Sequence, residues 1–156
     1  MPLVPFFVNA IHVPAPSPGR CYELGTAIRL AVETSAPDKR VVVYASGGWS
    51  HFTAGYPWPH YEGPHTVGSI ATEFDRRLAE QVAAGRGSAV QELSSADLLA
   101  NGGIELRSWC IVLGALGDRK PNDLVYEPFF RGVMGMAVGY WDLESANQES
   151  VAGTAR

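Results

Sequence analysis

The residues best suited to chemistry lie where an apolar run ends in two glycines. Gly47 and Gly48 precede Ser50 and His51, and all four follow Arg40–Ala45, whose β-branched residues are typical of a strand covered on both faces. Glycines allow a tight turn there, and ligand sites in α/β sheets lie beyond the carboxyl ends of strands. His51 is therefore a candidate acid/base group, because imidazole titrates near neutrality. A histidine that only hydrogen-bonds to the backbone is the plain structural alternative.

A second candidate is the carboxylate of Glu105. It follows Asn101, Gly102 and Gly103 and opens the apolar segment Ile104–Leu116, which has helical spacing. A carboxylate presented at the start of a helix beside a cleft is suited to binding a metal ion. A glutamate in a first helical turn also interacts favourably with the helix dipole, which explains the residue without any function.

The remaining three histidines lie in proline-containing segments. His60 and His65 belong to the aromatic loop Phe52–Gly68, and His12 begins a proline-rich stretch. Their spacing matches no compact metal motif, so we interpret them as residues that line a pocket or a surface. A metal site built from Glu105 and two of these histidines is a further hypothesis, but such a site also needs supporting geometry.

Ser50 raises the alternative of a hydrolase. Gly48, Trp49 and Ser50 begin like the nucleophile elbow G-x-S-x-G, but Phe52 stands where that motif needs glycine. A histidine next to the serine in sequence is also unlike a catalytic triad, whose members meet through the fold. A hydrolase using Ser50 and His51 is thus the less favoured interpretation.

Helical and strand patterns alternate along the chain. Apolar spacing predicts helices over Arg20–Glu33, Ile70–Ala84, Ser94–Ala100 and Ile104–Leu116. Strands are expected over Leu3–Ala10, Arg40–Ala45, Asp123–Tyr126 and Val133–Leu143. These elements predict an α/β fold, a three-layer domain with a mixed or mostly parallel sheet flanked by helices. The domain is expected over residues 1–144, with a polar, flexible tail over 145–156.

Composition narrows the class of protein. A chain of 156 residues predicts one domain, and a net charge of −4 without a Lys/Arg cluster argues against nucleic acid as a partner. No apolar run reaches the roughly 18 residues of a membrane span, and the first residues lack the pattern of a signal peptide. Cys21 and Cys110 are expected to be buried free thiols, which favours a cytoplasmic protein.

Taken together, five segments resemble the class III extradiol ring-cleavage dioxygenases, the family of the protocatechuate 4,5-dioxygenase catalytic (beta) subunit. The segments are FFVNAIHVPAPSPGRCYELGTAIRLAV, VVVYASGGWSHF, TEFDRRLAEQV, LANGGIELRSWCIVLGAL and GMAVGYW, in the family order. The most specific is GGWSHF, which matches the family pattern GG-x-SH after a strand. The second is the segment around Glu105, which matches G-x-E-L/I-x-x-W before an apolar helix.

The resemblance implies a chemistry for the two candidates. His51 falls on the family's acid/base histidine, and Glu105 falls on a glutamate that ligates Fe(II). The family opens a catechol-type ring beside its two hydroxyls and inserts both atoms of O2. Two histidines and one carboxylate leave iron positions open for a catecholate and for O2. Candidates for the substrate pocket are Gly48, Ser50, His12, His60 and His65.

The resemblance covers only the C-terminal half of the family fold. The two iron-binding histidines of the family belong to its N-terminal half, so the isolated chain is expected to lack activity. The chain is then a fragment of a longer product, a subunit of a homo- or hetero-oligomer whose partner supplies the histidines, or a degenerate domain. A non-catalytic interaction domain of the same fold is the corresponding alternative to an enzyme.

Overall fold

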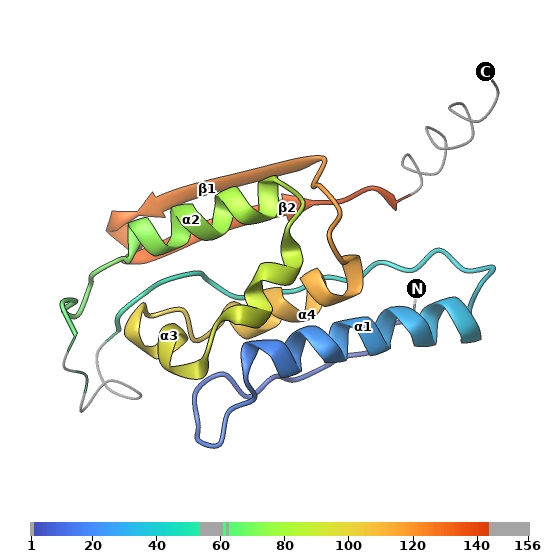
Figure 1. The fold of residues 1–156 in the computed structure, drawn as a ribbon, viewed down its shortest axis with the longest axis horizontal. Coiled ribbons are helices and arrows are strands. Elements are labelled where there is room, and N and C mark those ends of the chain that lie inside the picture. The colour runs from blue at the N-terminus through green and yellow to red at the C-terminus, as the bar shows by residue number, and fades with distance from the viewer. Residues whose placement is uncertain (1, 54–60, 62, 144–156) are drawn as a thin grey trace.

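The computed structural model describes residues 2–53, 61 and 63–143. Its elements, in chain order, are α1 (Pro18–Ser35), α2 (Thr72–Ala83), η1 (Gly87–Glu92), α3 (Ser95–Ala100), α4 (Leu106–Leu116), β1 (Asp123–Phe129), η2 (Phe130–Gly132) and β2 (Met134–Tyr140). Figure 1 shows α1 and α4 packed side by side, with α2 lying against the hairpin of β1 and β2.

Helix α4 forms the centre of the core. It is apolar on nearly all sides, as its sequence LRSWCIVLGAL predicts, and such a helix belongs in the interior. Helix α1 packs along it closely enough for the Thr26 hydroxyl to donate to the Gly114 carbonyl at 3.2 Å. The largest buried side chains gather around these two helices and include Trp49, Val82, Val90, Leu98, Leu106 and Leu113.

The four expected helices are confirmed to within a few residues, and two of them, α1 and α3, begin at a serine that caps the helix. The Ser17 hydroxyl accepts the Arg20 N–H at 3.2 Å, with Pro18 as the first helical residue of α1. Ser94 and Asp97 form a reciprocal capping box at the start of α3. Local chemistry was therefore sufficient to place these helices.

The two C-terminal strands are confirmed, and the structure shows that they form a hairpin. Strands β1 and β2 pair antiparallel, from Asp123 opposite Tyr140 to Phe129 opposite Met134. The small residues Gly135, Ala137 and Gly139 alternate with exposed ones along β2. Gly135 lies directly against Asp75 of α2, so small side chains on this face let the helix approach the sheet.

The expected three-layer arrangement with a mostly parallel sheet is not confirmed. Within the described ranges the sheet has two strands and is antiparallel. Leu3–Ala10 and Arg40–Ala45 are not strands, and the second is not covered on both faces, because Val42 is 79% and Tyr44 86% exposed. β-Branched residues favour extended backbone, but a parallel strand also needs neighbours far away in sequence. None of the described residues supplies such a neighbour for these two segments.

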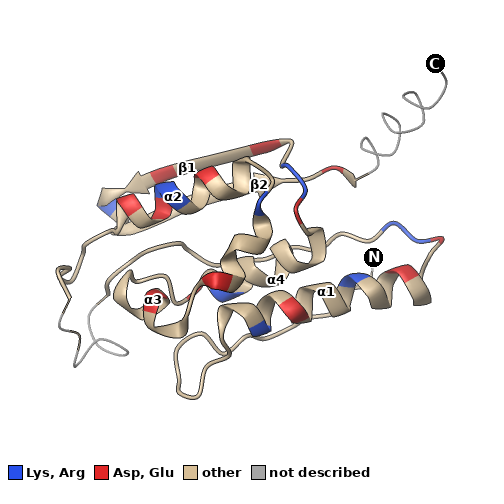
Figure 2. Ribbon diagram, in the orientation of Figure 1, with Lys and Arg blue, Asp and Glu red and all other residues tan. Residues whose placement is uncertain are grey.

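Charged side chains are spread over several elements (Figure 2), and Lys and Arg do not collect on one of them. The exposed face of α2 carries an ion pair between Arg77 and Glu73 at 3.0 Å, a kind of contact that contributes little stability. None of the helices in the described part of the chain combines the length and apolar character needed to cross a bilayer. Cys21 and Cys110 are buried and free, as expected.

The close contact of α1 and α4 gives a stability prediction. A Cβ at Gly25 would overlap the Ile111 carbonyl oxygen and lie 2.8 Å from the Ala115 nitrogen. Gly25→Ala is expected to lower the free energy of unfolding by about 1–3 kcal/mol, the usual cost of overpacking a core. Urea denaturation measures this change.

Gly19→Ala in the same helix is the matched control, because a Cβ there would meet only the Gln91 carbonyl oxygen, at 3.7 Å. Alanine is the better helix former, so this variant should be as stable as the wild type or more stable. Equal stability of Gly25→Ala and Gly19→Ala would contradict the close packing of α1 on α4.

Candidate active site

The segment that carries His51 is fixed by backbone hydrogen bonds on both sides. The Trp49 N–H donates to the Gly135 carbonyl at 3.0 Å, and the Gly135 N–H donates to the Ser50 carbonyl at 2.8 Å. The His51 N–H donates to the Gly102 carbonyl at 3.1 Å. These bonds tie the segment to strand β2 on one side and to the turn before α4 on the other.

Gly102 is the residue that brings the start of α4 against this segment. Its φ of +67° lies in the left-handed region. A Cβ at this position would also lie 2.7 Å from the His51 carbonyl oxygen. Both the backbone conformation and the close approach therefore require glycine at position 102, the first of the two glycines before Glu105.

The two main candidates meet in space. The His51 Nε2 lies 3.5 Å from the Glu105 Oε1, and the Glu105 Oε2 accepts the Gly48 N–H at 2.9 Å. Glu105 occupies the N-cap position of α4, but its side chain makes no capping hydrogen bond. The helix dipole by itself thus does not explain where this carboxylate points.

The pKa of the Glu105 carboxyl is lowered, chiefly by the His51 imidazole and also by the Gly48 N–H, against the opposing effect of partial burial. The carboxylate form is therefore favoured. A half-buried anion whose Oε1 faces an imidazole is suited to bind a cation or to hold a histidine in position.

The His51 imidazole is buried without being satisfied. The residue is 6% exposed, and neither Nδ1 nor Nε2 has a hydrogen-bond partner among the described residues. At 3.5 Å the contact with Glu105 is too long for a good hydrogen bond. Buried polar atoms normally have partners, so this ring is arranged for a group that the described protein atoms do not supply.

The Ser50 hydroxyl is buried and hydrogen-bonded, unlike the accessible hydroxyl of a catalytic serine. Its hydroxyl donates to the Asp75 Oδ2 at 2.6 Å and accepts the Ala71 N–H at 2.9 Å, and the residue is 0% exposed. The serine proton is directed at Asp75 rather than at His51. The hydrolase alternative therefore lacks a serine that a substrate can reach, and Ser50 supports the site without lining it.

Asp75 and Tyr126 were not anticipated from the sequence. The Tyr126 hydroxyl donates to the Asp75 Oδ2 at 2.8 Å, and Asp75 is fully buried. A signal was present, because Asp75, Leu78 and Val82 share the spacing of the buried face of α2. An acidic residue on an apolar helical stripe indicates a buried partner.

Trp49 supports the same segment from the core side. Its ring is fully buried, stacks on Tyr126 with centroids 5.5 Å apart and meets Trp109 edge-on at 5.3 Å. The Trp109 Nε1 donates to the Gly47 carbonyl at 3.1 Å. Aromatic packing and backbone bonding thus hold the turn before His51 in one position.

The other three histidines were candidates for the substrate pocket, and the structure does not group the two that it describes with His51 and Glu105 as metal ligands. His65 stacks on Phe52, with ring centroids 4.6 Å apart, and so lies beside the residue that follows His51. His12 is exposed in the proline-rich loop, where its backbone N–H donates to the Asn9 Oδ1 at 3.0 Å. His60 lies outside the described residues.

Within the described ranges, no three His, Cys, Asp or Glu side chains cluster as a metal site. Glu105, His12 and His65 therefore do not form the three-ligand site considered from the sequence. The unsatisfied imidazole of His51 and the carboxylate of Glu105 fit one side of a metal centre, but a complete Fe(II) site needs ligands beyond these.

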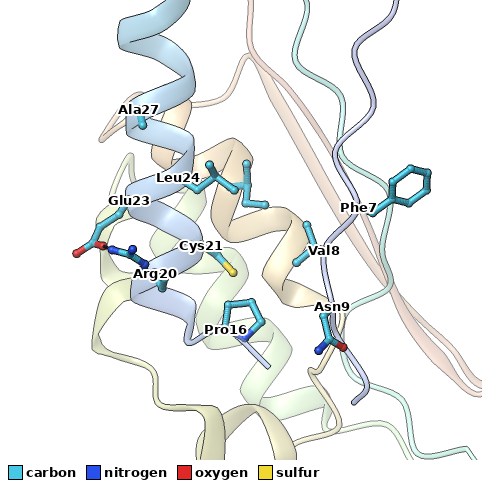
Figure 3. Close-up of a pocket in the computed structure, with 10 residues that line it drawn as sticks. Phe7, Val8, Asn9, Pro16, Arg20, Cys21, Glu23, Leu24 and Ala27 are labelled. Carbon is cyan, nitrogen blue, oxygen red and sulfur yellow. Dashed lines mark hydrogen bonds and ion pairs between the residues drawn. The ribbon is translucent and has the colours of Figure 1, made fainter. Parts of the chain in front are cut away.

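A separate groove of about 460 Å³ lies between α1 and the N-terminal extended segment (Figure 3). Its walls are mainly apolar and include Val8, Cys21 and Leu24, with Arg20 and Glu23 paired at 3.0 Å on the rim. Neither His51 nor Glu105 lines it. The groove is therefore distinct from the imidazole–carboxylate pair.

Comparison with protein families matches residues 1–137 to the catalytic LigB subunit of aromatic ring-opening dioxygenase. The match includes His51, Glu105 and all helices of the described structure. It also includes Leu3–Ala10 and Arg40–Ala45, which do not pair as strands with any other described residues.

The individual proteins that the chain matches are also named as dioxygenases of aromatic compounds. Gallate dioxygenase of Pseudomonas putida is 29% identical over 138 residues, which are 84% of this chain and 37% of the relative. A 2,3-dihydroxyphenylpropionate/2,3-dihydroxicinnamic acid 1,2-dioxygenase of Mycolicibacterium paratuberculosis is 50% identical over 50 residues, 32% of this chain and 15% of the relative. The matched parts thus span little more than a third of these relatives, or less.

The lowered pKa of Glu105 gives a prediction on pH. Its folded-state pKa lies below the ordinary 4.5, so its ionised form stabilises the fold above that pH. This contribution is lost as the pH falls through the folded-state pKa. The difference in unfolding free energy between wild type and Glu105→Gln should therefore be larger near neutral pH than in acid, as measured by urea denaturation.

Glu80→Gln, at an exposed glutamate on α2, is the control substitution. A difference between wild type and Glu105→Gln that stays constant across this pH range would show that the carboxylate has no favourable partner in the fold.

Proposed function

Because this chain belongs to the LigB family of catalytic subunits of aromatic ring-opening dioxygenases, we propose that it acts in extradiol cleavage of a catechol-type ring. In this proposal the chain is a non-haem Fe(II) dioxygenase domain that contributes one iron ligand, Glu105, and the acid/base group, His51. The observation that carries the proposal is the buried, unsatisfied imidazole of His51 placed 3.5 Å from the Glu105 carboxylate.

His51 has the properties that an acid/base group for a catechol needs. Its ring nitrogens are free of hydrogen bonds to the described residues, so one of them is available for a substrate hydroxyl. The neutral imidazole takes a proton from that hydroxyl, and the imidazolium is stabilised by the carboxylate of Glu105 beside it. The same proton is then available for return to an oxygen atom of the product.

Glu105 is the proposed protein ligand on this side of the iron. The Gly48 N–H holds its Oε2, which leaves Oε1 directed toward the space beside His51. Iron, when bound, would supply open coordination positions for a catechol and O2. The described residues supply no three-ligand cluster, so the proposal takes two histidine ligands from outside them.

A partner polypeptide, or a further part of the same one, is the proposed source of the missing ligands. The two segments Leu3–Ala10 and Arg40–Ala45 have no strand partner in the described part of the chain, and they expose apolar residues such as Phe7, Val42 and Tyr44. Extended apolar segments of this kind are suited to pairing with further strands. The proposed assembly is therefore a homo- or hetero-oligomer, or a longer chain, in which a sheet is completed next to the site.

The proposed location is the cytoplasm, supported by the free, buried thiols of Cys21 and Cys110. The proposed domain spans residues 1–144. The flexible tail expected over 145–156 lies outside the described residues.

The second candidate is a non-catalytic interaction domain of the same family. The absence of a three-ligand cluster from the described residues favours it, and so do the exposed apolar segments. Fe(II) titration with catechol or protocatechuate, followed by O2 uptake and the coloured ring-opened product, separates the two. Failure of every assembled form to consume O2 would favour the interaction domain.

In an active form of the protein, His51→Ala should lower turnover by about 10²–10⁴-fold, the usual contribution of a general acid/base group. Steady-state O2 uptake measures this loss. Arg77→Ala is the control, because Arg77 is exposed on α2 and pairs there with Glu73. A loss in Arg77→Ala as large as that in His51→Ala would remove the assigned role of His51.

Glu105→Ala in the same active form should lose bound iron, since the substitution removes the proposed carboxylate ligand. Metal content after dialysis, measured by atomic emission, tests this expectation. Asp97→Ala is the control, because Asp97 is an exposed carboxylate that caps α3 and is not part of the site. Full iron occupancy in Glu105→Ala would exclude Glu105 as a ligand.

A further inference from the structure

We propose that Asp75 is a positioning residue, which fixes the direction of the His51 side chain by holding the neighbouring Ser50. The inference rests on the role proposed above for His51, and it adds a residue of α2 to the machinery of that site. Its basis is a buried set of hydrogen bonds among Ser50, Asp75, Ala71 and Tyr126, which we call the Ser50 clasp.

The clasp uses every polar group of Ser50. The Ser50 N–H donates to the Asp75 Oδ1 at 3.2 Å, and its hydroxyl donates to the Asp75 Oδ2 at 2.6 Å. The same hydroxyl accepts the Ala71 N–H at 2.9 Å, and the Ser50 carbonyl accepts the Gly135 N–H at 2.8 Å. The Tyr126 hydroxyl donates a third hydrogen bond to Asp75, at 2.8 Å.

Burial makes this arrangement specific. Ser50 and Asp75 are both 0% exposed, so water does not replace a lost partner. Burial raises the pKa of the Asp75 carboxyl, and the hydrogen bonds from Ser50 and Tyr126 oppose that effect. A buried carboxylate is tolerated only with such donors, so moving Ser50 would leave buried acceptors unsatisfied. The clasp therefore allows Ser50 one position.

The position of Ser50 determines that of His51, because the two residues share a peptide bond. The Ser50 side chain is directed at Asp75, whereas the His51 ring is directed at Glu105. The clasp fixes the peptide on the N-terminal side of His51. The His51 backbone N–H is fixed separately, because it donates to the Gly102 carbonyl. A misplacement of about 1 Å in a reacting group can lower a rate by roughly 10²-fold, so this fixation has a functional consequence.

A second serine in the structure donates its N–H and its hydroxyl to one aspartate, but this pair lies away from the His51–Glu105 site. The Ser88 N–H and hydroxyl donate to Asp118 Oδ1 and Oδ2, at 2.8 and 2.9 Å. This second serine–aspartate pair is solvent-exposed and follows the C-terminal end of α4, whereas Glu105 precedes its start. Asp118→Asn thus removes an equivalent contact away from His51 and serves as the matched control.

The test compares ring signals of the four histidines by ¹H–¹³C and ¹H–¹⁵N NMR in wild type, Asp75→Asn, Ser50→Ala and Asp118→Asn. In Asp75→Asn the amide group presents an N–H donor where the carboxylate accepted, so His51 is expected to change shift or to give more than one set of signals. Ser50→Ala should move the same signals, and Asp118→Asn should leave them unchanged.

The NMR readout does not depend on dioxygenase activity. A negative NMR result would therefore contradict the positioning role of Asp75 without contradicting the proposed dioxygenase function, and the reverse also holds. Unchanged His51 signals in folded Asp75→Asn or Ser50→Ala would overturn the positioning role. If both variants fail to fold, amide hydrogen exchange in the wild type decides: Ser50 and His51 should exchange as slowly as the core of α4. If these amides exchange as fast as those of exposed loops, the positioning role is also overturned.

In an active form, Asp75→Asn should lower kcat by about 10²-fold with KM changed little, because the substrate contacts remain while the acid/base group is misplaced. Asp118→Asn, which removes the exposed Ser88 contact away from His51, should retain kcat. A change confined to KM in Asp75→Asn would contradict positioning of His51.

Discussion

The site depends on one constraint, the close approach of two turns that lie far apart in the sequence. Gly102 has a positive φ and no side chain, so its carbonyl accepts the His51 N–H and the start of α4 lies against the turn that carries the histidine. Only in this arrangement do the Glu105 carboxylate and the Gly48 N–H meet, and only then does the imidazole face an anion. Core packing of α4 against α1 and Trp49 holds the approach in place.

Much of this site could be predicted from local sequence. Two glycines before His51 indicated a tight turn, and apolar spacing indicated the four helices. These signals are local, because a turn or a helical pattern is decided by a few neighbouring residues. The pairing of His51 with Glu105 required more, namely the resemblance of two motifs in order to one family.

The rest depended on contacts that no local pattern specifies. The run Arg40–Ala45 has the composition of a buried strand, yet its neighbours in a sheet are not among the described residues, and it remains exposed. Ser50 resembled a nucleophile because the sequence does not show that Asp75 and Ala71 occupy its hydroxyl. The matched part of gallate dioxygenase is 37% of that protein, so the relative extends well beyond the part that this chain matches.

The central claim is that His51 and Glu105 share one pocket and interact there. The most direct measurement is the set of ring ¹⁵N chemical shifts of the histidines at neutral pH, in wild type and in Glu105→Gln. Loss of the carboxylate should alter the ring nitrogens of His51, whose Nε2 lies 3.5 Å from Oε1, and should leave those of His12 and His65 as they were. An unaltered His51 in folded Glu105→Gln would contradict the account.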